Sequence, residues 1–256
     1  MPLVLVTGAA GGLGRQILPR LIANGFSVRG TSRQPDPGIS GIEWARSDLA
    51  TGQGLAEAVL GVDAVVHAAS SSTRDTWAID VEGTSKLLEA CRAANVRHII
   101  YVSIVGVDRI PLAYYKAKLA AEERIMAGRV PWTIQRAPQF FSLVEFLIRQ
   151  AARYPLIFLP TDFKGQPVDT GEAADVFADL VRRGPSGRTP DFGGPKVMQL
   201  GEMAAAWKAA RKVHKPVVSL PLMGKVAAGF RAGYNTAPGY RVGSLQWEDW
   251  LNRAEF

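Results

Sequence analysis

A tyrosine and a lysine four residues apart offer the plainest chemistry in this sequence. Tyr114 and Lys118 lie in a segment predicted to be a helix, residues 112–128, where their spacing places both side chains on one face. A phenol titrates at about 10, and a neighbouring ammonium group stabilises the phenolate, so the tyrosine can exchange a proton near neutral pH. Ser103, at the end of the preceding predicted strand, would hold a substrate oxygen. The same spacing also occurs on ordinary amphipathic helices, and that alternative stays open.

The N-terminal segment predicts the framework that would position these side chains. An apolar strand, PLVLV at residues 2–6, runs into the glycine-rich turn TGAAGGLG at residues 7–14, and an amphipathic helix follows. Glycines let the chain turn sharply and let a phosphate approach the backbone, while the free N–H groups of the helix face that phosphate. We interpret the turn as a dinucleotide-binding site; the alternative is an ordinary tight turn.

The next predicted strand begins at Phe26, and the chain leaves it through Ser32 and Arg33. A site selective for NAD usually carries Asp or Glu at this point, where it binds the ribose hydroxyl groups. A guanidinium group instead holds a 2′-phosphate through charge-assisted hydrogen bonds. Arg33 therefore favours NADP(H) over NAD(H) as the cofactor, the alternative being a solvated loop arginine.

Strands and helices alternate as far as residue 138. Strands are predicted at residues 42–45, 98–103 and 131–138, and residues 63–72 are predicted to be a strand that runs into a loop of small residues. Helices are predicted at residues 55–60, 78–95 and 112–128. This alternation predicts an α/β fold, a Rossmann doubly wound parallel sheet with helices on both faces. Right-handed crossovers place the carboxyl ends of the strands at one edge, and with them Ser70, Ser103 and Pro138.

Beyond residue 140 the alternation loosens. We expect one Rossmann-type unit over residues 1–256, in which residues 1–140 form the dinucleotide-binding core. Residues 141–256 are expected to form mainly a small C-terminal substrate-binding cap and closing elements.

The composition narrows the class of protein. With 256 residues, 47% of them hydrophobic, the chain can bury a full core, and its longest apolar stretches are strand-sized, so we expect no transmembrane helix. A strand that begins at residue 2 leaves no room for a signal peptide, and the single cysteine, Cys91, cannot form an internal disulfide. These features predict a soluble, cytoplasmic protein.

The charge distribution and the positions of the histidines bear on binding partners and on metal sites. The net charge of +7 is spread along the chain without long basic runs, so we expect a small-molecule substrate and neither a nucleic acid nor a membrane as partner. His67 lies in an apolar strand and is predicted to be a hydrogen-bonded core residue. His98 and His214 lack partners at metal-ligand spacing, so no metal site is predicted, and the oligomeric state is left open.

Taken in order, the segments TGAAGGLG, HAAS, VEGTSKLLEA, VSIVG and YYKAK resemble the short-chain dehydrogenase/reductase superfamily, and most closely its extended and atypical branches. This resemblance implies a Rossmann fold and a nicotinamide cofactor. It also implies that Ser103, Tyr114 and Lys118 occupy catalytic positions, with Lys118 also on the nicotinamide ribose. The cofactor positions implied in the same way are Gly8, Gly11, Gly12, Leu13, Gly14, Asp48, Leu49, Ala68, Ala69 and Ser70. Ala10, Ser32, Arg33 and Pro138 are further candidates for cofactor binding.

Three features depart from the pattern of that superfamily. The spacing from Ser103 to Tyr114 is shorter than is usual in extended members, and Asp80 stands where Asn often stands. Tyr115 also competes with Tyr114 for the pocket, although only Tyr114 has a lysine four residues on. The sequence thus predicts an NADPH-dependent oxidoreductase that reduces a carbonyl group of a small, largely apolar substrate, with Tyr114 as general acid. The alternative is a non-catalytic NADP(H)-binding redox sensor or regulator.

An apolar and aromatic set is expected to line the substrate pocket. Each member could instead belong to the core, but a pocket for such a substrate would be mainly apolar. The set comprises Trp77, Ile104, Val105, Tyr115, Gln139, Phe140, Phe141 and Phe163.

Overall fold

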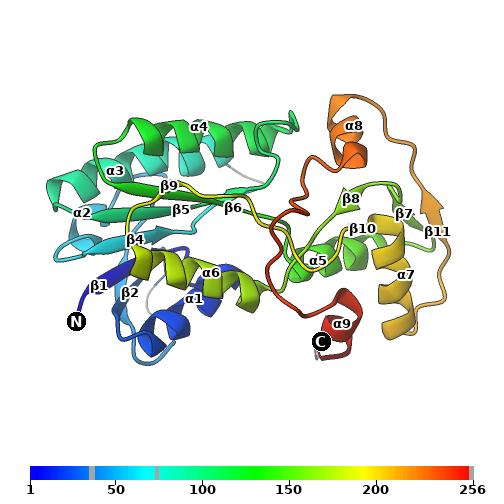
Figure 1. Ribbon diagram of the computed structural model, residues 1–256, viewed down its shortest axis with the longest axis horizontal. Coiled ribbons are helices and arrows are strands. Elements are labelled where there is room, and N and C mark those ends of the chain that lie inside the picture. The colour runs from blue at the N-terminus through cyan, green and yellow to red at the C-terminus, as the bar shows by residue number, and fades with distance from the viewer. Residues whose placement is uncertain (35–37, 73–74, 254–256) are drawn as a thin grey trace. The chain divides into compact units, whose positions relative to one another are not determined.

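Seven strands form a parallel sheet where the sequence predicts alternating strands and helices (Figure 1). The computed structural model describes residues 1–34, 38–72 and 75–253. The strand order is β3-β2-β1-β4-β5-β6-β9, which confirms the predicted Rossmann α/β fold. The strands are β1 (Leu3–Thr7), β2 (Ser27–Ser32), β3 (Glu43–Arg46), β4 (Ala64–His67), β5 (His98–Ile104), β6 (Trp132–Ala137) and β9 (Gly187–Arg188).

The central strands read as unbroken apolar runs because helices cover both faces of the sheet. Val4, Leu5 and Val6 of β1 are fully buried, and every residue of β4 is buried. Helices lie on both faces of the sheet (Figure 1). One face carries α1 (Gly12–Ala23) and α6 (Thr170–Arg183), and the other carries α2 (Leu55–Ala58), α3 (Gly83–Ala93) and α4 (Ala113–Ala127).

A π-helix replaces the first turns of the helix predicted over residues 78–95. The element η1 (Trp77–Glu82) runs directly into α3, and it buries Asp80 and Val81. Single π turns inside α-helices are frequent at functional sites. Hydrophobic periodicity does not distinguish the two helix types, and for this reason the sequence predicted one continuous helix.

The described chain divides into two compact units, each with its own core. Unit 1 comprises Met1–Ser103, Ala113–Gln135 and Ala174–Thr189, and unit 2 comprises Ile104–Leu112, Arg136–Ala173 and Pro190–Phe256. The chain therefore returns to unit 1 after residue 173. This return adds most of α6 to unit 1 and the edge strand β9 to its sheet. Both elements lie within residues 141–256, which the sequence predicts to be mainly cap and closing elements. The expectation of one Rossmann-type unit over residues 1–256 stays a prediction.

Unit 2 packs its helices around two short sheets. One sheet pairs β10 with β8 in antiparallel fashion, and the other pairs β11 with β7 in parallel. Its core contains Phe141, Ile148, Trp207 and Trp247, all nearly inaccessible to solvent. The elements are α5 (Phe141–Ala151), β7 (Ile157–Leu159), β8 (Lys164–Gly165), β10 (Met198–Gln199), α7 (Leu200–Ala210), β11 (Val217–Ser219), α8 (Lys225–Ala232) and α9 (Trp247–Arg253).

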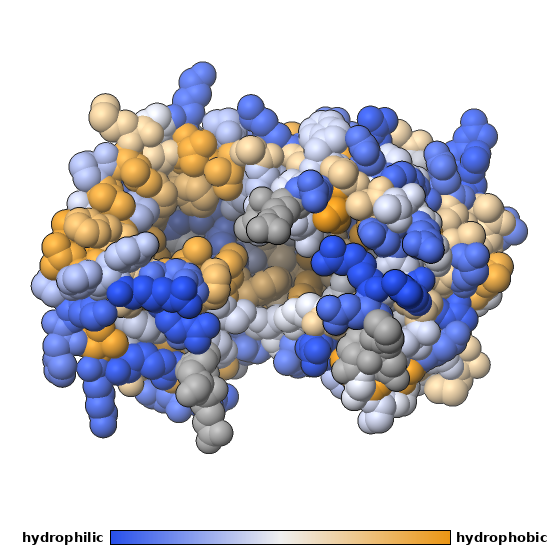
Figure 2. Space-filling view, turned by 180° about the vertical axis from the view of Figure 1, so that it is seen from behind, coloured by the Kyte–Doolittle hydropathy of each residue, from blue (hydrophilic) through white to orange (hydrophobic). Residues whose placement is uncertain are grey.

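No helix in the described ranges has the length and apolarity needed to cross a membrane. In the space-filling view, hydrophobic side chains gather in separate patches among hydrophilic ones (Figure 2).

Candidate functional site

The glycine-rich turn between β1 and α1 leaves room where a phosphate would lie. Gly8 has a φ of +66°, and a Cβ there would lie 2.8 Å from the backbone of Ala69. A Cβ on Gly14 would collide with the Gly8 carbonyl, so the helix packs this close to the turn only with glycine. At Gly12, by contrast, a Cβ would meet no atom within 4 Å. This open space lies at the N-terminus of α1, and the turn therefore fits a dinucleotide phosphate.

The residues expected around the ribose and adenine lie at the ends of β2 and β3. A cavity of about 350 Å³ is lined by Arg33, Asp48 and five other residues of unit 1. The Asp48 carboxylate accepts a 2.9 Å hydrogen bond from the Ala50 N–H, which fixes its orientation. Leu49 packs against the core of unit 1, where its side chain lies close to Gly83. The structure thus brings Arg33 and Asp48 to one cavity, and gives Leu49 a packing role.

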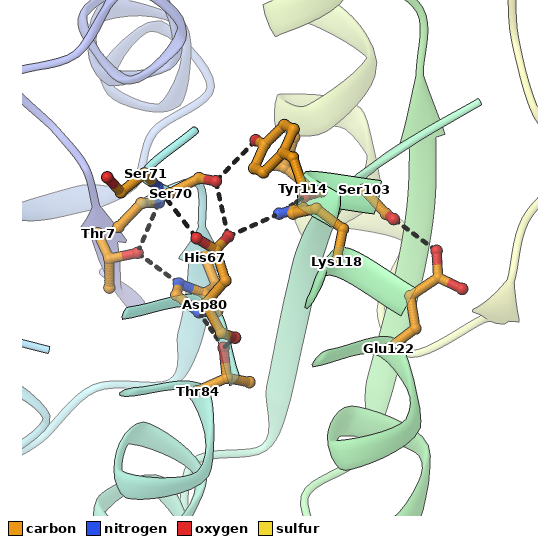
Figure 3. Close-up of polar contacts among 12 residues, drawn as sticks. Thr7, His67, Ser70, Ser71, Asp80, Thr84, Ser103, Tyr114, Lys118 and Glu122 are labelled. Carbon is orange, nitrogen blue, oxygen red and sulfur yellow. Dashed lines mark hydrogen bonds and ion pairs between the residues drawn. The ribbon is translucent and has the colours of Figure 1, made fainter. Parts of the chain in front are cut away.

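Tyr114 is joined to Lys118 through a chain of polar contacts that the sequence did not predict (Figure 3). Its hydroxyl lies 2.8 Å from the Ser70 hydroxyl, and Ser70 donates a 2.6 Å hydrogen bond to Oδ1 of Asp80. The other carboxylate oxygen of Asp80 accepts a 3.0 Å hydrogen bond from the Ser71 N–H. The Lys118 ammonium lies 3.6 Å from Asp80, and both side chains are almost wholly buried.

These contacts fix the position of the phenolic proton. Ser70 has a single hydroxyl hydrogen, and the Asp80 carboxylate takes it. The hydrogen between Ser70 and Tyr114 must therefore come from the phenol, which is the donor in the resting site. Burial raises the pKa of Tyr114, while its bond to Ser70 lowers it and the charge of Asp80 raises it further. Tyr114 therefore holds its proton at neutral pH.

Lys118 faces Asp80 rather than the phenol. It donates a 2.8 Å hydrogen bond to the Val102 carbonyl, and its ammonium lies 4.1 Å from the centre of the Tyr101 ring. Burial lowers the pKa of Lys118 to about 8, although the charge of Asp80 raises it. From the sequence, Lys118 is expected to lower the pKa of Tyr114. The structure corrects this expectation, because Asp80 partners the ammonium and the pKa of Tyr114 is raised.

Ser103 is the predicted catalytic residue that the structure moves out of the site. It is 2% exposed, and it donates a 2.5 Å hydrogen bond to the buried carboxyl of Glu122. Its side chain points toward Glu122 and away from Tyr114 (Figure 3). The hydroxyl beside Tyr114 is that of Ser70, from the HAAS loop. The short spacing from Ser103 to Tyr114 was the signal in the sequence that a different serine is involved.

The residues expected to line the substrate pocket fall into both units. Trp77 is 54% exposed in unit 1, and in unit 2 Phe163 stacks on Phe230 with ring centres 5.1 Å apart. Gln139 accepts a hydrogen bond from Asn235, Phe140 bridges to Val168, and Ile104 is half-buried. Pro138, expected near the cofactor, is a buried residue of unit 2. Three members of the predicted pocket are instead core residues, a correction that applies to Val105, Tyr115 and Phe141.

His67 is a hydrogen-bonded core residue, as the sequence predicts. Its Nδ1 lies 2.7 Å from the Thr7 hydroxyl and its Nε2 lies 2.9 Å from the Thr84 hydroxyl. Burial lowers the pKa of His67 to about 3, and the charge of Lys118 lowers it further. The imidazole is therefore neutral, which excludes it as a cationic group of the site.

The buried imidazole predicts loss of stability in acid. A histidine whose folded pKa is about 3 contributes stability that is present above its unfolded value of 6.5 and is lost as the pH falls below it. We expect His67→Gln to flatten the decline between these two values, on the order of a few kcal/mol, in urea unfolding measured against pH. Carboxylates such as Asp63 make the same pH-dependent contribution to the stability of the wild type and of the variant. The contribution of His67 is therefore the difference between the slopes of unfolding free energy against pH. If the unfolding free energies of both proteins decline in parallel as the pH falls, His67 does not cause the loss of stability in acid.

Comparison with known proteins shows which family the chain is similar to. A model of the NAD(P)H-binding family matches residues 8–183. The chain is 27% identical over 252 residues to the photosystem II assembly factor Ycf39 of Trieres chinensis, covering 91% of this chain and 78% of that protein. It is 31% identical over 151 residues to the 2-alkyl-3-oxoalkanoate reductase of Stenotrophomonas maltophilia, covering 49% of this chain and 46% of the reductase. The chain thus spans less than half of that reductase.

A solved structure shares the fold over nearly the whole chain. The NADPH-dependent quinone oxidoreductase QOR2 from Escherichia coli, complexed with NADPH, superposes with a TM-score of 0.79 at 17% identity. The match covers 97% of this chain and 98% of that one.

Proposed function

Because the chain belongs to the NAD(P)H-binding family, and resembles the extended and atypical short-chain dehydrogenases/reductases, we propose that it is an NADPH-dependent carbonyl reductase. Its substrate is a small, largely apolar aldehyde or ketone, and Tyr114 is the general acid. The observation that carries the proposal is the phenolic proton of Tyr114, held on Ser70 and backed by the buried pair of Asp80 and Lys118. The Stenotrophomonas relative is named as a reductase of a 2-alkyl-3-oxoalkanoate, which supports this reaction class.

The cofactor would bind along the edge where the parallel strands end. The backbone of Gly12 and Leu13 would hold its phosphates, and Arg33 and Asp48 would flank its adenosine. When bound, the nicotinamide supplies hydride to the substrate carbon.

The chain's own residues supply the proton. Tyr114 turns its hydrogen from Ser70 to the substrate oxygen and transfers it as negative charge develops there. The phenolate that remains is a strong acceptor, because burial raises the pKa of Tyr114. Ser70 can then rotate its hydrogen from Asp80 to the phenolate oxygen, while the Lys118 ammonium and the Ser71 N–H continue to neutralise Asp80.

The test of the reaction is NADPH oxidation, followed by absorbance, across a broad panel of aldehydes and ketones. We expect turnover above background with at least one apolar carbonyl compound. A panel on which the protein binds NADPH and oxidises none of it would reject the reductase.

The preference for NADPH is a separate prediction. Arg33 is exposed and can form two charge-assisted hydrogen bonds with a 2′-phosphate. We expect NADPH to bind about ten- to a hundredfold more tightly than NADH, and Arg33→Ala to remove most of this difference. Fluorescence titration of both cofactors with both proteins measures it. Equal affinities of the wild type for NADPH and NADH would contradict the assignment.

One observation favours a second candidate. The relative that matches 91% of the chain is named an assembly factor and not a reductase. This supports a non-catalytic NADP(H)-binding redox sensor or regulator as the alternative. A sensor would bind NADPH, stay silent across the carbonyl panel, and bind a protein partner differently in its NADP⁺ and NADPH forms.

A further inference from the structure

A second arginine lies beside Arg33 where two strands of unit 1 end. In the parallel ladder of β2 and β3, Ser32 is in register with Arg46, and the Ser47 N–H donates a 3.0 Å hydrogen bond to the Ser32 carbonyl. Residues in register on neighbouring strands lie directly beside each other. Arg46, the last residue of β3, therefore lies next to the point where Arg33 leaves β2.

Among the described residues, Arg33 and Arg46 lack the kind of carboxylate partner that Arg29 of the same ladder has. Arg29 and Glu43, at the opposite end of the same ladder, form a 2.9 Å ion pair. Within the described part of the chain, the guanidinium groups of Arg33 and Arg46 make neither an ion pair nor a hydrogen bond, and both residues are exposed. Two guanidinium groups close together without a counter-ion repel each other, and an anion between them relieves this repulsion.

The cavity of about 350 Å³ connects the two side chains. Arg33 and Arg46 both line it, together with Ser47, Asp48, Gln53, Gly54 and Glu57. Its volume lies in the range of about 300–1,000 Å³ that small-molecule sites occupy. Asp48 and Glu57 bring negative charge to the same cavity, so an anion must lie at its arginine end.

We propose that Arg46 is a second ligand of the 2′-phosphate of NADP(H), which it binds together with Arg33. The inference rests on the proposed preference for NADPH. On this inference, a residue of β3 contributes to the selectivity for NADPH over NADH, which the sequence attributes to Arg33 alone. The phosphate is a dianion, and two planar guanidinium groups can offer it separate pairs of N–H donors.

The test uses nucleotide fragments and needs no turnover. Calorimetric titration with 2′,5′-ADP and with 5′-AMP is run on the wild type, Arg46→Ala, Arg46→Lys and Arg33→Ala. Arg129→Ala is the matched control, because Arg129 is an exposed arginine of the same unit that lies outside the cavity. We expect Arg46→Ala to weaken 2′,5′-ADP binding about ten- to a hundredfold and to leave 5′-AMP binding within about twofold. Arg46→Lys should recover part of the loss, and Arg129→Ala should change neither affinity.

Each other outcome has a distinct meaning. If Arg46→Ala binds 2′,5′-ADP like the wild type while Arg33→Ala loses it, the inference is wrong and the NADPH preference stands. Equal losses for both fragments would show that Arg46 contacts the adenosine instead of the phosphate, which also overturns the inference. If the wild type does not prefer 2′,5′-ADP over 5′-AMP, the proposed cofactor preference fails, and the inference fails with it.

Discussion

Tyr114→Phe is expected to lower kcat by about 10²- to 10⁴-fold on any carbonyl compound that the wild type reduces, the usual contribution of a general acid. The substitution removes only the hydroxyl that Ser70 holds, and the ring keeps its place on α4. Affinity for NADPH should stay unchanged, because the phenolic oxygen is expected to meet the substrate and not the phosphates. Steady-state kinetics with NADPH fluorescence titration separates the two quantities.

Tyr115→Phe is the matched control for this prediction. Tyr115 neighbours Tyr114, with ring centres 6.3 Å apart, but it is 5% exposed and belongs to the core of unit 1. We expect its kcat to remain within about threefold of the wild type, since conservative changes away from the reacting group alter stability more than chemistry. If Tyr114→Phe turns over as fast as the wild type, or if Tyr115→Phe is the slower of the two, Tyr114 is not the acid.

The parts of the fold that rest on local pattern were predictable from the sequence. The buried strands read as apolar runs, and the glycine turn requires glycine at Gly8, where φ is positive, and at Gly14, where the backbone approaches closely. The edge strand β9 is two residues long, and too short to show a pattern. Its assignment to the sheet depends on a return of the chain that only tertiary structure reveals.

The candidate site was predictable for Tyr114 and Lys118, and not for their partners. Spacing on one helix placed these two residues correctly relative to each other. Ser103 meets Glu122, which lies one turn beyond Lys118 on α4, and so it points away from the phenol. The contact between Ser70 and Asp80 joins a loop to a π-helix, and neither hydrophobic periodicity nor motif spacing specifies such a contact.

The buried pair of Asp80 and Lys118 leads to the second large expected effect. Asp80→Ala leaves the Lys118 ammonium without its counter-ion, although the Lys118 side chain is only 3% exposed. It also removes the carboxylate that accepts hydrogen bonds from the Ser70 hydroxyl and the Ser71 N–H. Removing one partner of a buried ion pair costs about 3–5 kcal/mol. We expect a loss of this size in the free energy of unfolding, measured by chemical denaturation at pH 6. Glu43→Ala, which breaks the ion pair of Arg29 with the exposed Glu43 carboxylate, should cost no more than about 1 kcal/mol.

A second substitution and a change of pH distinguish charge from packing at this pair. Lys118→Met removes the cation while Asp80 keeps its two donors, so the double variant should lose about 1–3 kcal/mol less than the sum of the single losses.

The pH dependence is the second measurement. The pKa of Lys118 is about 8 with the charge of Asp80 beside it, and because that charge raises the pKa, Asp80→Ala lowers it below 8. Above pH 8 the lysine is then neutral in both proteins, so the cost of Asp80→Ala should shrink between pH 6 and pH 9. A cost that is independent of pH, with additive losses in the double variant, would mean that Asp80 acts through packing alone.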